Sequence, residues 1–213
     1  MIRILSVTFL SLICMISASQ DRNFQIWNLN SFDVPLADKT SIKFSEKIHY
    51  TPKTNSIDLK FADTKLEYNI KSWCTIGGGG RFLWFRRDND WIQEQRPMVF
   101  GTLSASINRF DLDFSNRIAY RFLNKADNHF RHWQKFVISF PEISKPKFQF
   151  FSAFESFCKL NIEKLHMLRL YAGMNTIQKD HFEMKIYYAL QKNKDVPYWI
   201  TTDIIGINFS IEI

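Results

Sequence analysis

Residues 108–122 read Asn-Arg-Phe-Asp-Leu-Asp-Phe-Ser-Asn-Arg-Ile-Ala-Tyr-Arg-Phe, and apolar side chains occupy almost every second position of this stretch. Successive side chains of a β-strand point to opposite faces, so the pattern predicts a strand with one apolar and one charged face. It would be about fifteen residues long, whereas strands of globular proteins usually have roughly 5–6. The apolar face comprises Phe110, Leu112, Phe114, Ile118, Tyr120 and Phe122, and the polar face comprises Arg109, Asp111, Asp113, Ser115, Arg117 and Arg121.

Alternation of this kind recurs along the chain and defines about eleven segments. Short connections separate them, which predicts antiparallel neighbours in one up-and-down meander without an internal domain boundary. No sustained 3.6-residue periodicity is present, and only Ala153–Leu168 contains a possible helical turn. The apolar parity changes between Phe61 and Leu66, which predicts a bulge or a change of environment. The segments are Phe24–Phe32, Ser41–Tyr50, Ser56–Ile70, Trp73–Arg86, Trp91–Ala105, Asn108–Phe122, Phe130–Phe140, Lys147–Phe157, Leu165–Met174, His181–Gln191 and Thr202–Ile213.

The N-terminus has the pattern of a secretory signal peptide. A single cation, Arg3, precedes an apolar run at Ile4–Ile16, and small residues follow at Ser17–Ser19. The run is shorter than the roughly 20 apolar residues that a membrane-spanning helix needs, so a signal peptide is favoured over a membrane anchor. We therefore expect a signal peptide at residues 1–19 and an exported β-barrel domain at residues 20–213.

Composition favours an ordered, strand-rich chain. Aromatic residues make up 16% of the sequence, and the formal net charge is +7. The cations are spread singly through the alternating segments, without a basic block or a recognition helix, which argues against nucleic acid as a partner. A basic lumen or attraction to anionic lipid headgroups explains the charge better. Beyond the signal peptide, Cys74 and Cys158 could pair or remain free thiols, and two cysteines are too few for a disulfide scaffold.

Two architectures contain such a meander. A soluble barrel directs the apolar face inward, and a transmembrane barrel directs it outward against lipid. The segments reach or exceed the roughly 9–11 residues of a tilted membrane strand. We expect an all-β, antiparallel up-and-down transmembrane β-barrel of about ten to twelve strands, with twelve slightly preferred, because a closed bacterial barrel with both termini on one side needs an even number. Aromatic residues near strand ends are expected to form interfacial girdles; they are Trp27, Tyr50, Trp73, Trp84, Trp91, Phe122, Phe140, Tyr198 and Trp199.

In a transmembrane barrel the ionisable side chains would line the lumen. They could form a charge-paired plug that fills a narrow barrel, or they could form a selective lining. An arginine-dominated constriction would favour anions, as charged rings do in pores, and Arg96, Arg117 and Arg121 are the first residues to test. The candidate lumen-lining residues are Arg81, Glu94, Arg96, Arg109, Asp111, Asp113, Arg117, Arg121, Arg131, Glu155, Arg169, Glu183 and Lys185.

The sequence contains no convincing catalytic or metal-binding pattern, so we expect neither an enzyme nor a bound cofactor. Gly77–Gly80 is followed by a strand pattern, which fits a bent strand, or one approached closely by a bulky lumen side chain, better than a phosphate loop. His129 and His132 would point to opposite faces of a strand, which argues against a shared metal. Two alternatives stay open: a soluble extracytoplasmic β-barrel that binds an apolar ligand, and a barrel-borne lipid hydrolase.

Several short motifs, in their order along the chain, resemble a bacterial family of uncharacterised outer-membrane β-barrels, domain of unknown function 2490. The resemblance implies a β-barrel in the outer membrane and no particular activity. Outer-membrane lipid and the barrel-assembly machinery would then be the partners. The chain ends in Ile213, whereas such barrels commonly end in Phe. The motifs lie at Phe24–Trp27, Gly77–Arg81, Glu94–Pro97, Asn116–Arg121, Phe150–Glu155, Arg169–Gly173 and Tyr187–Gln191.

Overall fold

The structure of the chain is a computed structural model. The expected signal peptide lies outside the residues that it describes. No helix in the described part of the chain is long and apolar enough to cross a membrane. The structure describes residues 22–87, 90–143, 148–162, 164–179, 181–195 and 198–213.

Each segment that the alternation predicted contains a strand, with bounds that differ by a few residues. The described residues form eleven strands and two short 3-10 helices, η1 (Pro52–Thr54) and η2 (Leu160–Ile162). The second of these lies where the sequence predicted a possible helical turn. The strands are β1 (Asn23–Ala37), β2 (Thr40–Thr51), β3 (Ser56–Lys71), β4 (Cys74–Arg87), β5 (Asp90–Ile107), β6 (Phe110–Leu123), β7 (His129–Ser139), β8 (Gln149–Lys159), β9 (Lys164–Lys179), β10 (Phe182–Asp195) and β11 (Tyr198–Glu212).

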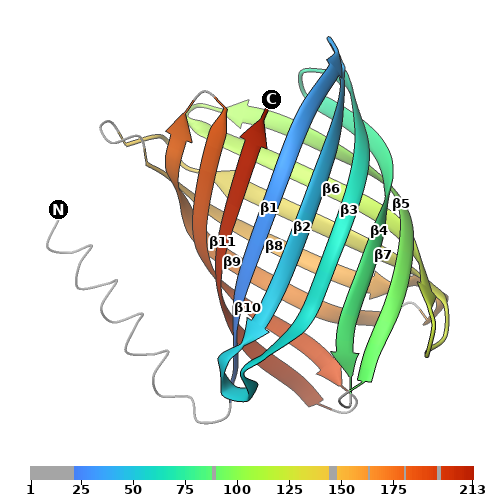
Figure 1. Cartoon of the computed structure of the whole chain (residues 1–213). Coiled ribbons are helices and arrows are strands. Elements are labelled where there is room, and N and C mark those ends of the chain that lie inside the picture. The colour runs from blue at the N-terminus through green and yellow to red at the C-terminus, as the bar shows by residue number, and fades with distance from the viewer. Residues whose placement is uncertain (1–21, 88–89, 144–147, 163, 180, 196–197) are drawn as a thin grey trace, which may run out of the picture.

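The eleven described strands form one closed barrel, in which β1 completes the ring against β11 (Figure 1). Strands adjacent in the chain pair antiparallel, whereas β1 and β11 pair in parallel, from Asn23 opposite Thr202 to Asp33 opposite Glu212. The expected even number of strands is therefore wrong. With an odd number of alternating strands the first and the last run in the same direction, and a parallel ladder still satisfies both edges.

The apolar face of the strands points outward and the polar face points into the lumen. Thirty-seven large apolar side chains of the described residues are exposed on the barrel and its loops. Phe110, Phe114 and Ile186 are among them, with relative exposures of 39%, 39% and 37%. Arg117 and Lys185 have the opposite parity and line an internal cavity. This confirms the outward orientation of the apolar faces, which is the reverse of a barrel with an apolar interior.

Two details of this orientation differ from the sequence expectations. Trp27 was expected in an outer girdle, but it is fully buried inside the barrel, because it has the opposite parity to the exposed Ile26. In β3, Leu59 and Phe61 face the lumen, whereas Leu66 is exposed on the outer surface. The β2–β3 pairing continues across these β3 positions without a register shift. The parity change is therefore a change of environment and not a bulge.

Candidate functional site

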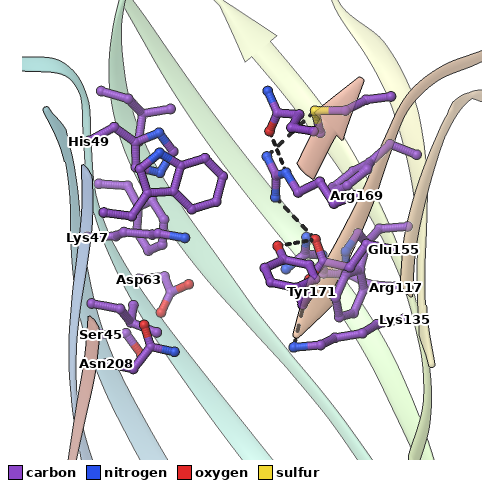
Figure 2. Close-up of a pocket in the computed structure, with 18 of the residues that line it drawn as sticks. Ser45, Lys47, His49, Asp63, Arg117, Lys135, Glu155, Arg169, Tyr171 and Asn208 are labelled. Carbon is purple, nitrogen blue, oxygen red and sulfur yellow. Dashed lines mark hydrogen bonds and ion pairs between the residues drawn. The ribbon is translucent and has the colours of Figure 1, made fainter. Parts of the chain in front are cut away.

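The barrel interior contains a cavity of about 940 Å³, lined by residues from all eleven strands. Among the described residues, the cavity is lined by eleven lysine and arginine side chains and by only four aspartate and glutamate side chains. Figure 2 shows part of it, with Lys47 and Asp63 on one wall and Lys135, Glu155 and Arg169 on the facing wall. The lumen is therefore rich in positive charge.

Glu94 holds two arginines together at the β5–β6 wall. Glu94 as a whole residue is 2% exposed, and its carboxylate accepts hydrogen bonds from Arg96 Nε at 2.6 Å and from Arg121 Nε at 2.7 Å. Arg121 also donates from Nη2 to the other carboxylate oxygen at 2.6 Å, so this pair is bidentate. His129 Nε2 lies 3.1 Å from the remaining Nη1 of Arg121. Two of the three arginines that the sequence singled out for an anion constriction are thus paired with a protein carboxylate.

Asp63 and Arg81 form a second pair across β3 and β4, where they occupy directly opposed positions. Nη2 and Nε of Arg81 both donate hydrogen bonds to Asp63 Oδ2, and the bond from Nε is 3.1 Å long. Lys65 lies 4.0 Å from that oxygen, and the Arg81 guanidinium lies 3.7 Å from the centre of the Phe61 ring. Asp63 is almost completely buried, so its charge is balanced by these cations rather than by bulk solvent.

Glu155 organises a third group on β7, β8 and β9 (Figure 2). Its Oε2 accepts from Arg169 Nη1 at 3.1 Å and from the Tyr171 hydroxyl at 2.9 Å, and its Oε1 lies 3.8 Å from Lys135. Arg169 Nε donates to Gln191 Oε1 at 2.5 Å. This guanidinium therefore has partners on two neighbouring strands, which fixes its position on the wall.

Three lumen cations contact aromatic rings instead of carboxylates. The Arg117 guanidinium lies 4.4 Å from the centre of the Trp133 ring, Arg131 lies 4.3 Å from Phe157, and Lys47 lies 3.9 Å from Trp27. Among the described residues, no carboxylate lies within 4.0 Å of the charged groups of these three cations. Cation–π contacts of this kind hold a cation in place without neutralising it.

Trp27 is the centre of an aromatic contact that reaches across the lumen. Its ring stacks on His49 with centroids 3.9 Å apart and 8° between the planes. The Arg169 guanidinium of β9 lies 4.8 Å from the Trp27 ring of β1, with β10 and β11 between these strands. Sequence reasoning missed this contact, although the parity shared by Trp27 with Gln25 and by His49 with Lys47 carried the signal. The contact narrows the lumen.

Glycines make room for bulky lumen side chains on neighbouring strands. A Cβ at Gly206 would overlap the Tyr187 ring, and a Cβ at Gly173 would lie 2.6 Å from Tyr187 Cβ. A Cβ at Gly77 would overlap the Phe100 ring. The interpretation of the glycine-rich segment as a strand approached by a bulky neighbour is therefore correct at Gly77.

Residues 24–199 match the model of a protein family, DUF2490, whose description is 'protein of unknown function'. The chain belongs to the DUF2490 family. No curated protein and no solved structure matches it significantly. The matched residues begin in β1 and end in β11, so they include all the candidate lumen-lining residues of this DUF2490 chain.

Nine of the thirteen candidate residues line the cavity, and four do not. Glu94 is buried in the wall beneath Arg96 and Arg121. Arg109 is exposed in the turn before β6, and Asp111, one residue into β6, is exposed and bonds to Ser106. Glu183 lies at the start of β10, where it pairs with Lys185. Arg109, Asp111 and Glu183 thus lie at strand ends, beyond the cavity, because parity alone does not give depth along the barrel. The nine are Arg81, Arg96, Asp113, Arg117, Arg121, Arg131, Glu155, Arg169 and Lys185.

The described residues contain no group of three or more His, Cys, Asp and Glu side chains that could hold a metal ion. Cys74 and Cys158 are free thiols. The arrangement offers positive charge, fixed guanidinium groups and aromatic walls, and this chemistry suits the binding or passage of anions.

Proposed function

We propose that the protein is an outer-membrane β-barrel whose cationic lumen passes small anions across the membrane. One observation carries the proposal: the barrel is apolar outside and cationic inside, with eleven basic and four acidic side chains in the described cavity lining. A soluble barrel that binds an apolar ligand would need the reverse distribution, with apolar side chains around the ligand.

The outer surface supports insertion into a bilayer. Soluble monomers rarely expose contiguous apolar patches of more than a few hundred Å², whereas here every strand carries exposed large apolar side chains. The strands have between 11 and 18 residues, which covers the roughly 9–11 that a tilted strand needs to cross the hydrocarbon core. Because the eleven described strands form a closed ring, each of them is paired on both sides and none presents an open edge to lipid.

Aromatic side chains at the strand ends support the same orientation. Lys60 lies 5.7 Å from the Trp84 ring centre and 5.5 Å from that of Trp91, on the outer surface near one end of the barrel. Aromatic rings with a nearby lysine are typical of the boundary between lipid and water. Tyr50 and Trp84 are partly exposed. The predicted girdle residues with exposed side chains are Trp73, Trp91, Phe122, Phe140, Tyr198 and Trp199.

An exported barrel of this kind belongs in the outer membrane, and the expected signal peptide at residues 1–19 supports export. Its partners are then the surrounding lipid and the barrel-assembly machinery. Nothing in the proposal requires a cofactor, an enzymatic activity or nucleic acid.

Anion preference follows from the charge of the lumen. The three central carboxylates, Asp63, Glu94 and Glu155, are each shared by two cations. Arg117 and Arg131 remain without an acidic partner among the described residues. Fixed positive charge between low-dielectric walls attracts anions and repels cations. The contact between Arg169 and Trp27 keeps the lumen narrow, so small solutes are favoured.

Planar bilayers test this proposal. With a tenfold potassium chloride gradient, the purified protein is expected to give a reversal potential displaced toward that of chloride. Arg117→Ala should reduce this displacement, because it removes a lumen charge that forms no direct ion pair with a described carboxylate. Arg109→Ala removes an equal charge from an exposed turn and should leave it unchanged. Silent bilayers over repeated insertions of heat-modifiable, folded protein would contradict passage and leave a structural barrel.

A further inference from the structure

Two aromatic rings on the lumen wall form a shelf for three arginines. Trp133 of β7 and Phe157 of β8 are directly opposed cross-strand partners. The Arg117 guanidinium lies 4.4 Å from the centre of the Trp133 ring, and those of Arg131 and Arg169 lie 4.3 Å and 4.9 Å from that of Phe157. We call Trp133, Phe157 and these three arginines the aromatic shelf.

The three arginines of the aromatic shelf differ in their partners. Arg169 donates to Glu155 and to Gln191. Arg117 and Arg131 have no carboxylate partner among the described residues, and Arg131 Nε is buried without a hydrogen-bond partner. An unsatisfied buried donor on a charged group is costly, so a feature of this kind calls for an acceptor.

The described residues directly opposite Arg117 and Arg131 on the neighbouring strands are not acidic. Arg117 lies between Phe100 of β5 and Trp133 of β7 in the strand register. Arg131 lies between Ala119 of β6 and Lys159 of β8. The charged groups with the largest electrostatic effect on Arg131 are themselves arginines: Arg96, Arg121, Arg169 and Arg117. Arg117 feels the charges of Glu155 and Asp63, but neither carboxylate lies within 4.0 Å of its guanidinium. An oxyanion in the lumen would supply the direct acceptor that both guanidinium groups lack among the described residues.

Register places the two open arginines close together. Arg117 pairs with Trp133 and Ala119 pairs with Arg131, so Arg117 and Arg131 are diagonal neighbours on one face, with Cα atoms roughly 7–8 Å apart. Each guanidinium rests on a ring, which fixes its plane while leaving N–H edges available. Two such forks match the oxygen spacing of a carboxylate or a phosphate group.

We propose that the aromatic shelf is a binding subsite for a small organic oxyanion, a carboxylate or a phosphate monoester attached to an apolar group. The oxyanion accepts hydrogen bonds from Arg117 and Arg131. The apolar group packs beside Trp133, which is partly exposed and lines the cavity. Phe157 and Met167 are 3% and 6% exposed and support the arginines from below. The subsite rests on the proposed anion passage and specifies the class of anion that binds in the lumen.

Calorimetric titration of the full barrel in detergent tests the subsite with four probes: benzoate, phenyl phosphate, inorganic phosphate and benzamide. Benzoate and phenyl phosphate should bind, inorganic phosphate should bind more weakly, and the neutral benzamide should not bind. The tighter of the first two probes identifies the headgroup. Arg117→Lys and Arg131→Lys keep the charge but remove the planar fork, so each should raise the dissociation constant roughly tenfold to a hundredfold. Arg109→Lys, in the exposed turn, is the matched control and should bind as the unaltered protein does.

Equal binding of benzamide and benzoate would overturn the proposal, since only apolar contact would then be operating. Unchanged benzoate affinity in both lysine variants would also overturn it, as would the absence of binding by either organic oxyanion. Heat-modifiable migration on gels checks that each variant is folded. Bilayer recordings separate the two proposals: binding without conductance retains the subsite and rejects passage, whereas anion-preferring conductance without binding does the opposite.

Discussion

Buried carboxylates fix the cations of the lumen at the scale of single residues. The side chains of Asp63, Glu94 and Glu155 are 1%, 0% and 8% exposed, and each is contacted by two cations. An ion pair of this kind contributes little net stability over an apolar pair, but removal of one partner leaves charge without compensation. These three carboxylates therefore allow several lysine and arginine side chains to lie close together inside the barrel.

Glu94 provides the sharpest residue-scale prediction. Glu94→Gln retains the shape but removes the charge shared by Arg96 and Arg121, so the free energy of unfolding should fall by about 3 kcal/mol. Glu183→Gln breaks the more exposed pair with Lys185, which should cost less than about 1 kcal/mol. Urea titrations, read by the gel shift between folded and unfolded barrel, measure both. Similar losses of unfolding free energy in the two variants would mean that Glu94 is no more important for charge compensation than the exposed Glu183.

Strands are the elements that the sequence predicted best. Alternation is a local property, and from residues 108–122 it gave a strand that the structure places at Phe110–Leu123. Inward and outward faces followed from the same parity, which explains why nine of the thirteen candidate residues line the cavity. Depth along the barrel is not encoded in parity, which predicts Arg109 and Glu183 in the lumen although they lie beyond its cavity.

Other features depended on contacts between distant segments. The position of Trp27 near a strand end predicts a girdle residue, yet its parity places it inside, where it contacts His49 and Arg169. Likewise, no local pattern indicates that β1 meets β11, because each strand alternates in the same way whichever neighbour it has. The register of β5, β6 and β7 is also needed to see that no described acidic residue lies directly opposite Arg117.

Adjacent positions of β6 test the orientation of an element in lipid. Phe114 is 39% exposed on the outer face, and Ser115 lines the cavity. With Cys74 and Cys158 replaced by serine, Ser115→Cys in lipid vesicles should react with an anionic thiosulfonate, and Phe114→Cys should react only with an apolar maleimide. The reason is that successive side chains would meet the aqueous lumen and the hydrocarbon in turn. Reaction of both cysteines with the anionic reagent would mean that the outer face is in water.

The parallel closure governs the molecule as a whole. Eleven alternating strands make β1 and β11 run in the same direction, with eleven residues of each in register from Asn23 opposite Thr202 to Asp33 opposite Glu212. The backbone N–H of Ile213 extends this seam with a 3.0 Å hydrogen bond to the Asp33 carbonyl. The start of β1 and the end of β11 consequently lie at opposite ends of the barrel (Figure 1).

If the barrel spans a membrane, its two termini must then lie on opposite sides. An epitope inserted before Asn23 and a different epitope after Ile213 should differ in accessibility to antibody on intact cells, and both should be accessible after the membrane is permeabilised. Versions with each epitope alone control for effects of the tags on assembly. An even-stranded barrel closed by antiparallel pairing would place both termini on the same side, since its first and last strands run in opposite directions. Equal accessibility of the two epitopes on intact cells would therefore contradict the parallel closure, even if the barrel were inserted normally.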